Sequence, residues 1–440
     1  MQKCPGITLL ALVIASGVAT WIFTFIITKT IKIVIDEDGD ASWILRFIFT
    51  ILGYTTVFVP CYVLIYLSRR HNLHTLSGCQ WMLLRLILTG HTYEIVPESE
   101  NDNLPERASK HEAKSLYQKA LSLFQCCVGL QVSYLVWGIL QEKIMTSDYN
   151  DGETVEKFTD SQFLVFVNRI LAFMFSGVYL LFTTQNVHRT PLYKYSFCSV
   201  SNTLSSWCQY EALKFVSFPT QVLAKSAKVI PVMLMGKLVS RAQYKNYEYA
   251  TAVLISVGMT AFLLGSGETK KGNSVTTVSG AVLLCGYLLF DSFTANWQSA
   301  LFKEHKPSSV QMMCGVNLMS CLFTSASLIQ QGGFFYSISF AARHPVFIVD
   351  CLLTAISSAL GQLCIFATIS NFGPVVFTII MTVRQGLSIL LSCLLYHHEL
   401  SYMGGLGVFI VFLAIFLRLY YAQQHKKRKI DLSENSTSKV

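Results

Sequence analysis

Apolar runs of about 20 to 25 residues recur along almost the whole chain, and each is long enough to cross a bilayer as one helix. The chain has 440 residues, of which 52% are hydrophobic and only 13% are charged. That charged share is about half of what a typical soluble domain carries, which excludes an ordinary cytosolic enzyme. The sequence therefore predicts an all-α polytopic membrane protein.

Two apolar runs come first and form a predicted N-terminal hydrophobic appendage over residues 1–68. The first run, about Leu9 to Ile27, is either a signal peptide cut near Ala19 or a retained anchor. We expect retention, because apolar residues continue well past the sequence that resembles a cleavage site. The second run, Trp43 to Leu67, ends on two arginines, which indicates a cytoplasmic end.

A polar stretch over residues 69–115 follows and is predicted to be a cytoplasmic linker. After it the sequence offers ten candidate membrane spans, each bounded by polar or charged residues. Their approximate ranges are 117–140, 162–183, 195–214, 219–239, 248–266, 277–297, 309–330, 346–369, 373–396 and 402–421.

Charged residues between the spans predict their orientation. The loops after the second, fourth and sixth spans carry lysine and arginine, whereas the loop after the first span is acidic. Positive residues accumulate in cytoplasmic loops, so even-numbered loops are predicted to be cytoplasmic and odd-numbered loops lumenal. Lys270 and Lys271, next to Glu268, weaken this pattern without reversing it. The basic tail over 422–440 places the C-terminus in the cytoplasm.

Ten spans divide into two groups of five, residues 116–266 and 277–421. Because five is odd, two successive groups enter the membrane in opposite senses, as in inverted-repeat transporters. The sequence thus predicts a ten-helix core arranged as a five-plus-five inverted repeat, with an accidental count of ten as the alternative. Short loops leave no room for a soluble catalytic domain, so any function must lie in the bundle or at its mouths.

Several charged side chains lie within the spans, where one charge costs about 2.5–3.5 kcal/mol even on a lenient scale. In the fourth span Lys225 and Lys228 are three residues apart and Gln221 is four residues before Lys225, so a helix would place them on one face. In the ninth span Arg384 and Gln385 lie at a similar depth. These residues predict a cationic pocket for a polyanionic solute.

The alternative is that the cations pair with Glu211 and Asp291, carboxylates within the third and sixth spans. Two carboxylates cannot neutralise Lys225, Lys228 and Arg384 together, so the surplus favours an anionic ligand. Lys214 is three residues after Glu211 and either pairs with it locally or adds a fourth cation. Tyr210 is one of several aromatic residues that can stack on a base, although most such residues serve packing.

Catalytic and metal-binding motifs are absent from the sequence. It contains no Walker A loop, no HExxH and no GxSxG, which argues against an ATP-driven pump and against common hydrolases. Its 13 cysteines show no zinc-binding spacing and are interpreted as small hydrophobic residues. We therefore expect no enzyme activity, no metal and no cofactor, and secondary transport is left as the function.

Several stretches resemble a known family. The motif Gly138-x-x-Gln141-Glu142 resembles a signature of the nucleotide-sugar transporter family, within the drug/metabolite transporter superfamily. Residues 195–239 are similar almost throughout to the members of this family that carry 3′-phosphoadenosine 5′-phosphosulfate (PAPS). Shorter matches of the same kind lie at 163–169, 290–294 and 377–385, and the resemblance extends over about residues 120–420.

The resemblance implies a Golgi membrane protein that moves PAPS from the cytosol to the lumen by alternating access, in exchange for a nucleotide monophosphate. It places phosphate binding on Lys228, with Lys225, and on Arg384, and it adds Gln141 and Glu142 of the signature as candidates. PAPS carries about four negative charges, which suits three or four cations. We expect no nucleic acid as a partner, and a homodimer is left open.

Two alternatives to PAPS transport are kept. One is an antiporter of UDP-sugars, which needs fewer cations because its substrate carries fewer charges. The other, from a different class, is a membrane-embedded transferase or a receptor, against which the missing catalytic motifs and the ten spans argue.

Overall fold

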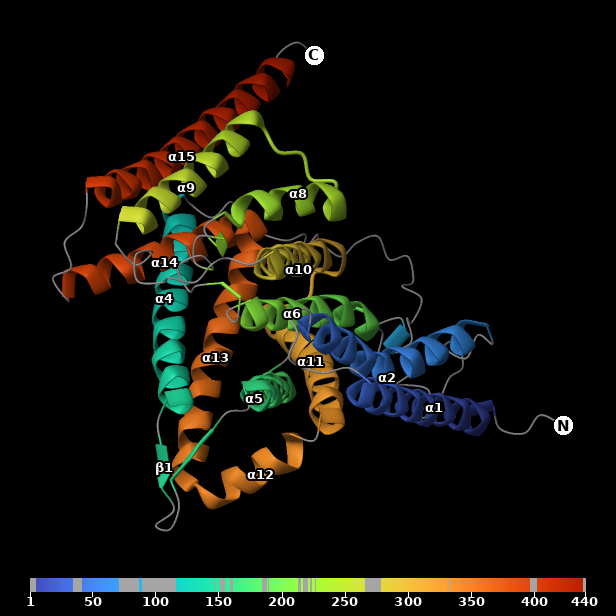
Figure 1. Cartoon of the computed structure of the whole chain (residues 1–440). Coiled ribbons are helices and arrows are strands. Elements are labelled where there is room, and N and C mark those ends of the chain that lie inside the picture. Colours follow the sequence, from blue (N-terminus) through green and yellow to red (C-terminus); the bar gives the residue numbers. More distant parts are fainter. Residues whose placement is uncertain are drawn as a thin grey trace. The chain divides into compact units, whose positions relative to one another are not determined.

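The structure is a computed structural model whose described residues are almost entirely helical (Figure 1). It describes residues 5–34, 42–70, 87–88, 116–146, 148–150, 155–158, 161–183, 188, 190–212, 215–216, 221, 224–225, 227–265, 278–331, 333–395 and 402–437. The helices are α1 (Pro5–Val34), α2 (Ser42–Arg70), α4 (Leu116–Thr146), α5 (Ser161–Phe182), α6 (Leu192–Ala212), α8 (Val229–Ser240), α9 (Asn246–Gly265), α10 (Val278–His305), α11 (Ser309–Gln331), α12 (Gly333–Arg343), α13 (Pro345–Phe372), α14 (Pro374–Leu395) and α15 (Tyr402–Thr437). A short hairpin of β1 (Asp148–Asn150) and β2 (Val155–Lys157) adds the two described strands.

Among the described residues, six helices are long and apolar enough to cross a membrane. They are Phe47–Arg70, Ala120–Gln141, Gln162–Phe182, Val278–His305, Ser309–Gln330 and Pro345–Phe372. Shorter apolar helices cover Ala11–Ile27, Val229–Ser240, Pro374–Arg384 and Tyr402–Arg418. Each predicted core span overlaps a described helix, although α8 matches only the second half of the span 219–239, and this agreement confirms a helical, polytopic membrane protein. The hairpin and α12 were not predicted.

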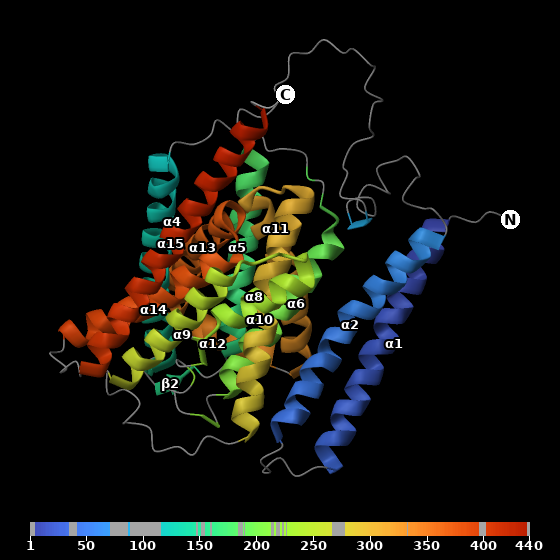
Figure 2. The same ribbon diagram turned by 90° about the horizontal axis from the view of Figure 1, so that it is seen from above.

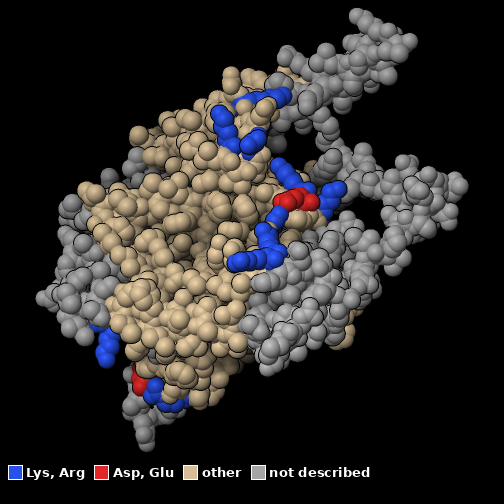
Figure 3. All heavy atoms as spheres, turned by 90° about the vertical axis from the view of Figure 1, so that its right-hand side faces the viewer, with Lys and Arg blue, Asp and Glu red and all other residues tan. Residues whose placement is uncertain are grey.

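Large apolar side chains on these helices face outward, as lipid contact requires. Phe182 is 87% exposed and Leu181 is 84% exposed, and Ile139 of α4 is 62% exposed. On the face in Figure 3 the described charged side chains lie in small groups, and most of the other described surface is uncharged. Many large apolar side chains exposed on membrane-length helices, with few charges beside them, agree with a bilayer environment.

The chain divides into two compact units, each built from separate stretches. The first contains Met1–Thr203 and Leu301–Asn371, and the second contains Leu204–Ala300 and Phe372–Val440. The sequential boundaries predicted above, including the inverted repeat, stay predictions.

In the first unit, α1 packs along α2 (Figure 2), and α11 packs on both α2 and α5. The β-hairpin is antiparallel, with Tyr149 opposite Glu156. The Tyr149 ring is buried against Phe340 of α12 and Phe347 of α13, with ring centroids 5.9 and 5.5 Å apart. The hairpin and α12 thus cover one end of this unit with a shared aromatic core. Strands of three residues and a helix of 11 residues are too short to appear among the apolar runs of about 20 residues that predict membrane spans.

In the second unit, α15 lies along α9 (Figure 1). Their contact depends on small residues: a Cβ atom on Gly407 of α15 would lie 2.6 Å from the carbonyl oxygen of Gly258 of α9, and closer still to the backbone of Phe262. Glycines at such positions let membrane helices approach closely.

A buried apolar cluster in the second unit positions the start of α8. It contains Val229, Val232 and Met233 from α8, with partners Ala252, Ile255, Val375, Ile379 and Ala414 from α9, α14 and α15. Because Val229 is the first residue of α8, the cluster fixes the place of the residue before it, Lys228.

Candidate functional site

The helix that the sequence predicted over 219–239 is interrupted. Gln221, Ala224 and Lys225 are helical, but Ala227 and Lys228 lie in a turn and α8 begins at Val229. Pro231 explains where the helix begins. It lies in the first turn of α8, where a missing N–H costs little and the fixed φ favours helix initiation.

The backbone before α8 is held by short-range hydrogen bonds. The N–H groups of Ala227, Lys228 and Ile230 donate to the carbonyl oxygens three residues earlier, each at 3.2 Å. This is the 3₁₀ pattern, in which side chains three residues apart eclipse each other. Lys225 and Lys228 therefore still project from one side of the chain, although the continuous helix that predicted this was wrong.

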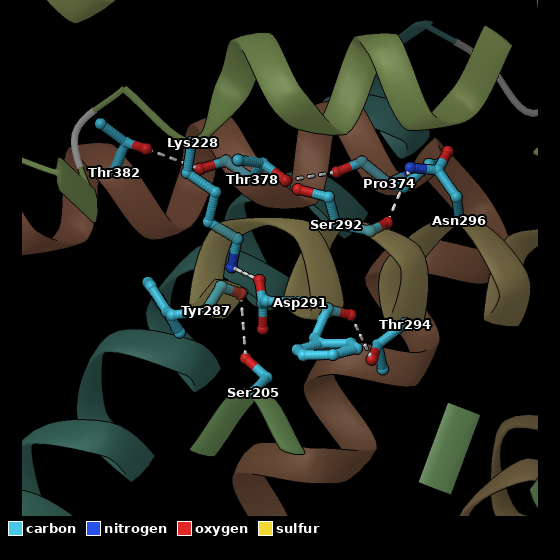
Figure 4. Close-up of polar contacts among 11 residues, drawn as sticks. Ser205, Lys228, Tyr287, Asp291, Ser292, Thr294, Asn296, Pro374, Thr378 and Thr382 are labelled. Atoms are coloured by element: carbon cyan, nitrogen blue, oxygen red, sulfur yellow. Dashed lines mark hydrogen bonds and ion pairs between the residues drawn. The ribbon is translucent and has the colours of Figure 1, made fainter. Parts of the chain in front are cut away.

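Lys228 forms an ion pair with Asp291 of α10 (Figure 4). Figure 4 shows the Lys228 side chain extending from the start of α8 toward the Asp291 carboxylate. The two side chains are 12% and 24% exposed, so the pair is mostly shielded from solvent. The pairing that the sequence offered as the alternative is therefore present for Lys228.

Lys225 contacts a different residue of α10, Tyr287. Its ammonium lies 5.9 Å from the centre of the Tyr287 ring, within the range of a cation–π contact. Tyr287 and Asp291 are four residues apart on α10 and so share one face. The carbonyl of Tyr287 also accepts a hydrogen bond of 3.2 Å from Ser205 of α6.

The charges that act on Lys225 come from Lys228, Asp291 and Arg384 of α14. These four described residues comprise three cations and one carboxylate, which leaves an excess of two positive charges. We call Lys225, Lys228, Asp291 and Arg384 the charged cluster. The charged cluster combines residues from three elements of the second unit. Its excess of two positive charges is suited to binding an anion.

Asn296 ties the start of α8 to α10, a role that the sequence analysis missed. Its buried amide donates to the carbonyl oxygen of Val232 at 2.9 Å and to that of Ser292 at 2.9 Å. The available signal was an asparagine between Ala295 and Trp297 at the end of an apolar run. By holding α8 on α10, Asn296 helps to keep Lys228 within reach of Asp291.

Other sequence candidates lie elsewhere or outside the described side chains. Gln221 is 1% exposed and donates to the carbonyl oxygen of Gln209 at 2.7 Å, which gives it a structural contact at the end of α6. Gln141 is half-buried on α4 of the first unit. Lys214 and the side chains of Glu142, Tyr210 and Gln385 lie outside the described part of the structure.

A second charged group lies in the first unit and was not predicted. Lys143 of α4 binds the buried carboxylate of Asp350 of α13 at 2.7 Å, and the Tyr149 hydroxyl donates to the other oxygen at 3.3 Å. Burial and the neighbouring Asp350 raise the pKa of Tyr149, so its hydroxyl stays protonated and can donate. Because Asp350 has both a cation and a hydroxyl as partners, this group serves to hold the hairpin on α13.

Comparison with known proteins identifies the family. The pattern of the UAA transporter family matches residues 122–422. The chain is 52% identical over 395 residues to adenosine 3′-phospho 5′-phosphosulfate transporter 1 of Homo sapiens, covering 89% of this chain and 90% of that protein. It is 50% identical to the protein of the same name from Drosophila melanogaster, covering 89% and 86%.

A more distant relative is the UDP-galactose/UDP-glucose transporter 5 of Arabidopsis thaliana, which is 36% identical over 330 residues. That match covers 74% of this chain and 94% of the relative. The family and these relatives are transporters, which confirms the prediction that the chain is not an enzyme. The family match, over residues 122–422, also covers nearly the same residues as the resemblance found in the sequence, about 120–420. The chain therefore belongs to the UAA transporter family.

Proposed function

We propose that this protein carries PAPS across the Golgi membrane, from the cytosol to the lumen, by alternating access and in exchange for a nucleotide monophosphate. The relatives at 50–52% identity are named as PAPS transporters, whereas the relative named for UDP-sugars is 36% identical. This difference favours PAPS over the alternative, a UDP-sugar antiporter.

The observation that carries this proposal is the positive excess of the charged cluster. Lys225, Lys228 and Arg384 are partly or mostly withdrawn from solvent, and Asp291 supplies the one carboxylate among the charges that act on Lys225. A substrate with about four negative charges compensates this excess better than a UDP-sugar with about two. We propose that Lys228, Lys225 and Arg384 bind the phosphate and sulfate groups.

Helix packing supports the five-plus-five repeat that we propose for 116–266 and 277–421. Counted from α4, the second and seventh core helices, α5 and α11, pack on each other. The same holds for the fourth and ninth, α8 and α14, and for the fifth and tenth, α9 and α15. Contacts between helices in equivalent positions are expected where two repeats are related by a pseudo-two-fold axis.

Ion pairs support the proposed sidedness of the loops. Arg343 binds Glu156 at 2.9 Å and so joins the seventh loop to the first, both predicted to be lumenal. Lys194 binds Glu304 at 2.6 Å and joins the second and sixth loops, both predicted to be cytoplasmic. Arg418, at the end of the last span, lies 3.8 Å from Glu248, which follows the fourth loop. That last pair supports a cytoplasmic C-terminus.

The test is uptake of radiolabelled PAPS into proteoliposomes that contain the purified protein, preloaded with AMP or left empty. Saturable uptake that is stimulated by internal AMP and resists competition by UDP-sugars is expected. Empty liposomes and liposomes with heat-denatured protein are the controls. Uptake of a UDP-sugar without uptake of PAPS would overturn the choice of substrate and favour the UDP-sugar antiporter.

A further inference from the structure

One face of α10 holds both lysines of the charged cluster. Lys228 is paired with the Asp291 carboxylate, and Lys225 lies over the ring of Tyr287 one turn away. These two partners differ in strength. A carboxylate competes directly with a phosphate for an ammonium group, whereas the face of an aromatic ring is a weaker partner that can be kept while a phosphate binds.

We propose that Asp291 is a specificity-determining residue: its charge offsets one lysine and thereby sets how strongly the site favours substrates with more negative charges. This inference rests on the proposed function, in which the cluster binds the substrate anion. A phosphate that binds Lys228 must displace the Asp291 carboxylate or share the lysine with it. Asp291 thus weakens the binding of every anion, and it weakens highly charged anions most.

The size of the effect follows from charge counting. Without the Asp291 charge, the excess of the cluster rises from two positive charges to three. Because a Coulomb energy is proportional to the charge of the ligand, the gain in affinity should follow the ligand's charge. A ligand with about four charges, such as PAPS, should gain about ten- to a hundredfold, the range of one charge-assisted contact. AMP, with about half the charge, should gain about the square root of that factor.

The test is the equilibrium binding of adenosine, AMP and PAPS to purified full-length protein in lipid nanodiscs at one fixed, low salt concentration. Asp291→Asn should bind PAPS about ten- to a hundredfold more tightly, AMP less so, and neutral adenosine as the wild type does. Asp291→Glu, which keeps the charge, should retain the wild-type dependence on ligand charge. Glu304→Gln removes an exposed carboxylate that is also paired with a lysine, and serves as the matched control.

A change of equal size for all three ligands, or no change, would overturn the proposal, because a purely structural role of Asp291 does not depend on ligand charge. If Asp291→Asn does not accumulate, the double variant Lys228→Met with Asp291→Asn removes the pair and keeps the excess at two charges. It should show the wild-type charge dependence, and a steeper one would contradict the proposal.

The series also separates this inference from the proposed function. If the wild type binds no PAPS, the proposed substrate is wrong, and the same comparison with uridine, UMP and UDP still tests Asp291.

Discussion

Replacing Lys228 with alanine should remove a substrate contact and also leave Asp291 without its cation. Lys228 precedes the first residue of α8, and the apolar cluster around Val229 and Val232 does not depend on the lysine side chain. We therefore expect α8 to remain in place. The variant should reach the membrane in amounts close to those of the wild type while losing uptake.

Two magnitudes follow from the structure. One charge-assisted contact to a phosphate contributes about 1.5–3 kcal/mol, so KM for PAPS should rise about ten- to a hundredfold. Breaking the pair with Asp291 should destabilise the fold as well. The cost should be about 1–3 kcal/mol, below the range for a fully buried pair, because Asp291 is 24% exposed.

The assay is PAPS uptake in proteoliposomes, normalised to protein content, together with the thermal unfolding temperature of each variant. Lys228→Ala combined with Asp291→Ala should recover most of the lost stability and, because it keeps an excess of two positive charges, the wild-type dependence of affinity on ligand charge. Lys228→Arg should be intermediate in uptake, because a planar fork does not replace a compact ammonium. A wild-type KM in Lys228→Ala would refute the assignment of Lys228 as a substrate ligand.

Three further outcomes are expected. Gly407→Val should lower the unfolding temperature and the amount of folded protein, because no Cβ atom fits against α9, whereas Gly405→Val, with open space around its Cα, should change neither. Tyr149→Phe should cost about 1.5–3 kcal/mol, the value of a hydrogen bond to a charged group such as the Asp350 carboxylate, and a loss much larger than this would mean that the ring packing had changed. Asn435, in the chain's one glycosylation sequon, should carry no glycan, and a shift in gel mobility after endoglycosidase treatment would place the C-terminus in the lumen.

The lengths of the apolar runs predicted where the helices lie, because a run of about twenty apolar residues crosses a bilayer as one helix. They did not predict which charged residues pair. Lys228 had two carboxylates available within the spans, and the choice of Asp291 depends on how α8 packs on α10. Asp350 was missed for a similar reason, because its partners Lys143 and Tyr149 are about 200 residues away in the sequence. Residue types thus indicated the chemistry of the cluster, and tertiary packing decided its partners.

The break before α8 shows how an irregular backbone can lie in a membrane-spanning segment at little cost. In a bilayer each backbone N–H needs a partner within the protein. Here the N–H groups of Ala227, Lys228 and Ile230 have partners three residues back, Val232 donates to the carbonyl of Lys228 at 3.1 Å, and Pro231 has no N–H to satisfy. The change from 3₁₀ to α geometry therefore leaves these donors satisfied. It also keeps Lys225 and Lys228 aligned on α10, because side chains three residues apart eclipse in a 3₁₀ turn but diverge by about 60° in an α-helix.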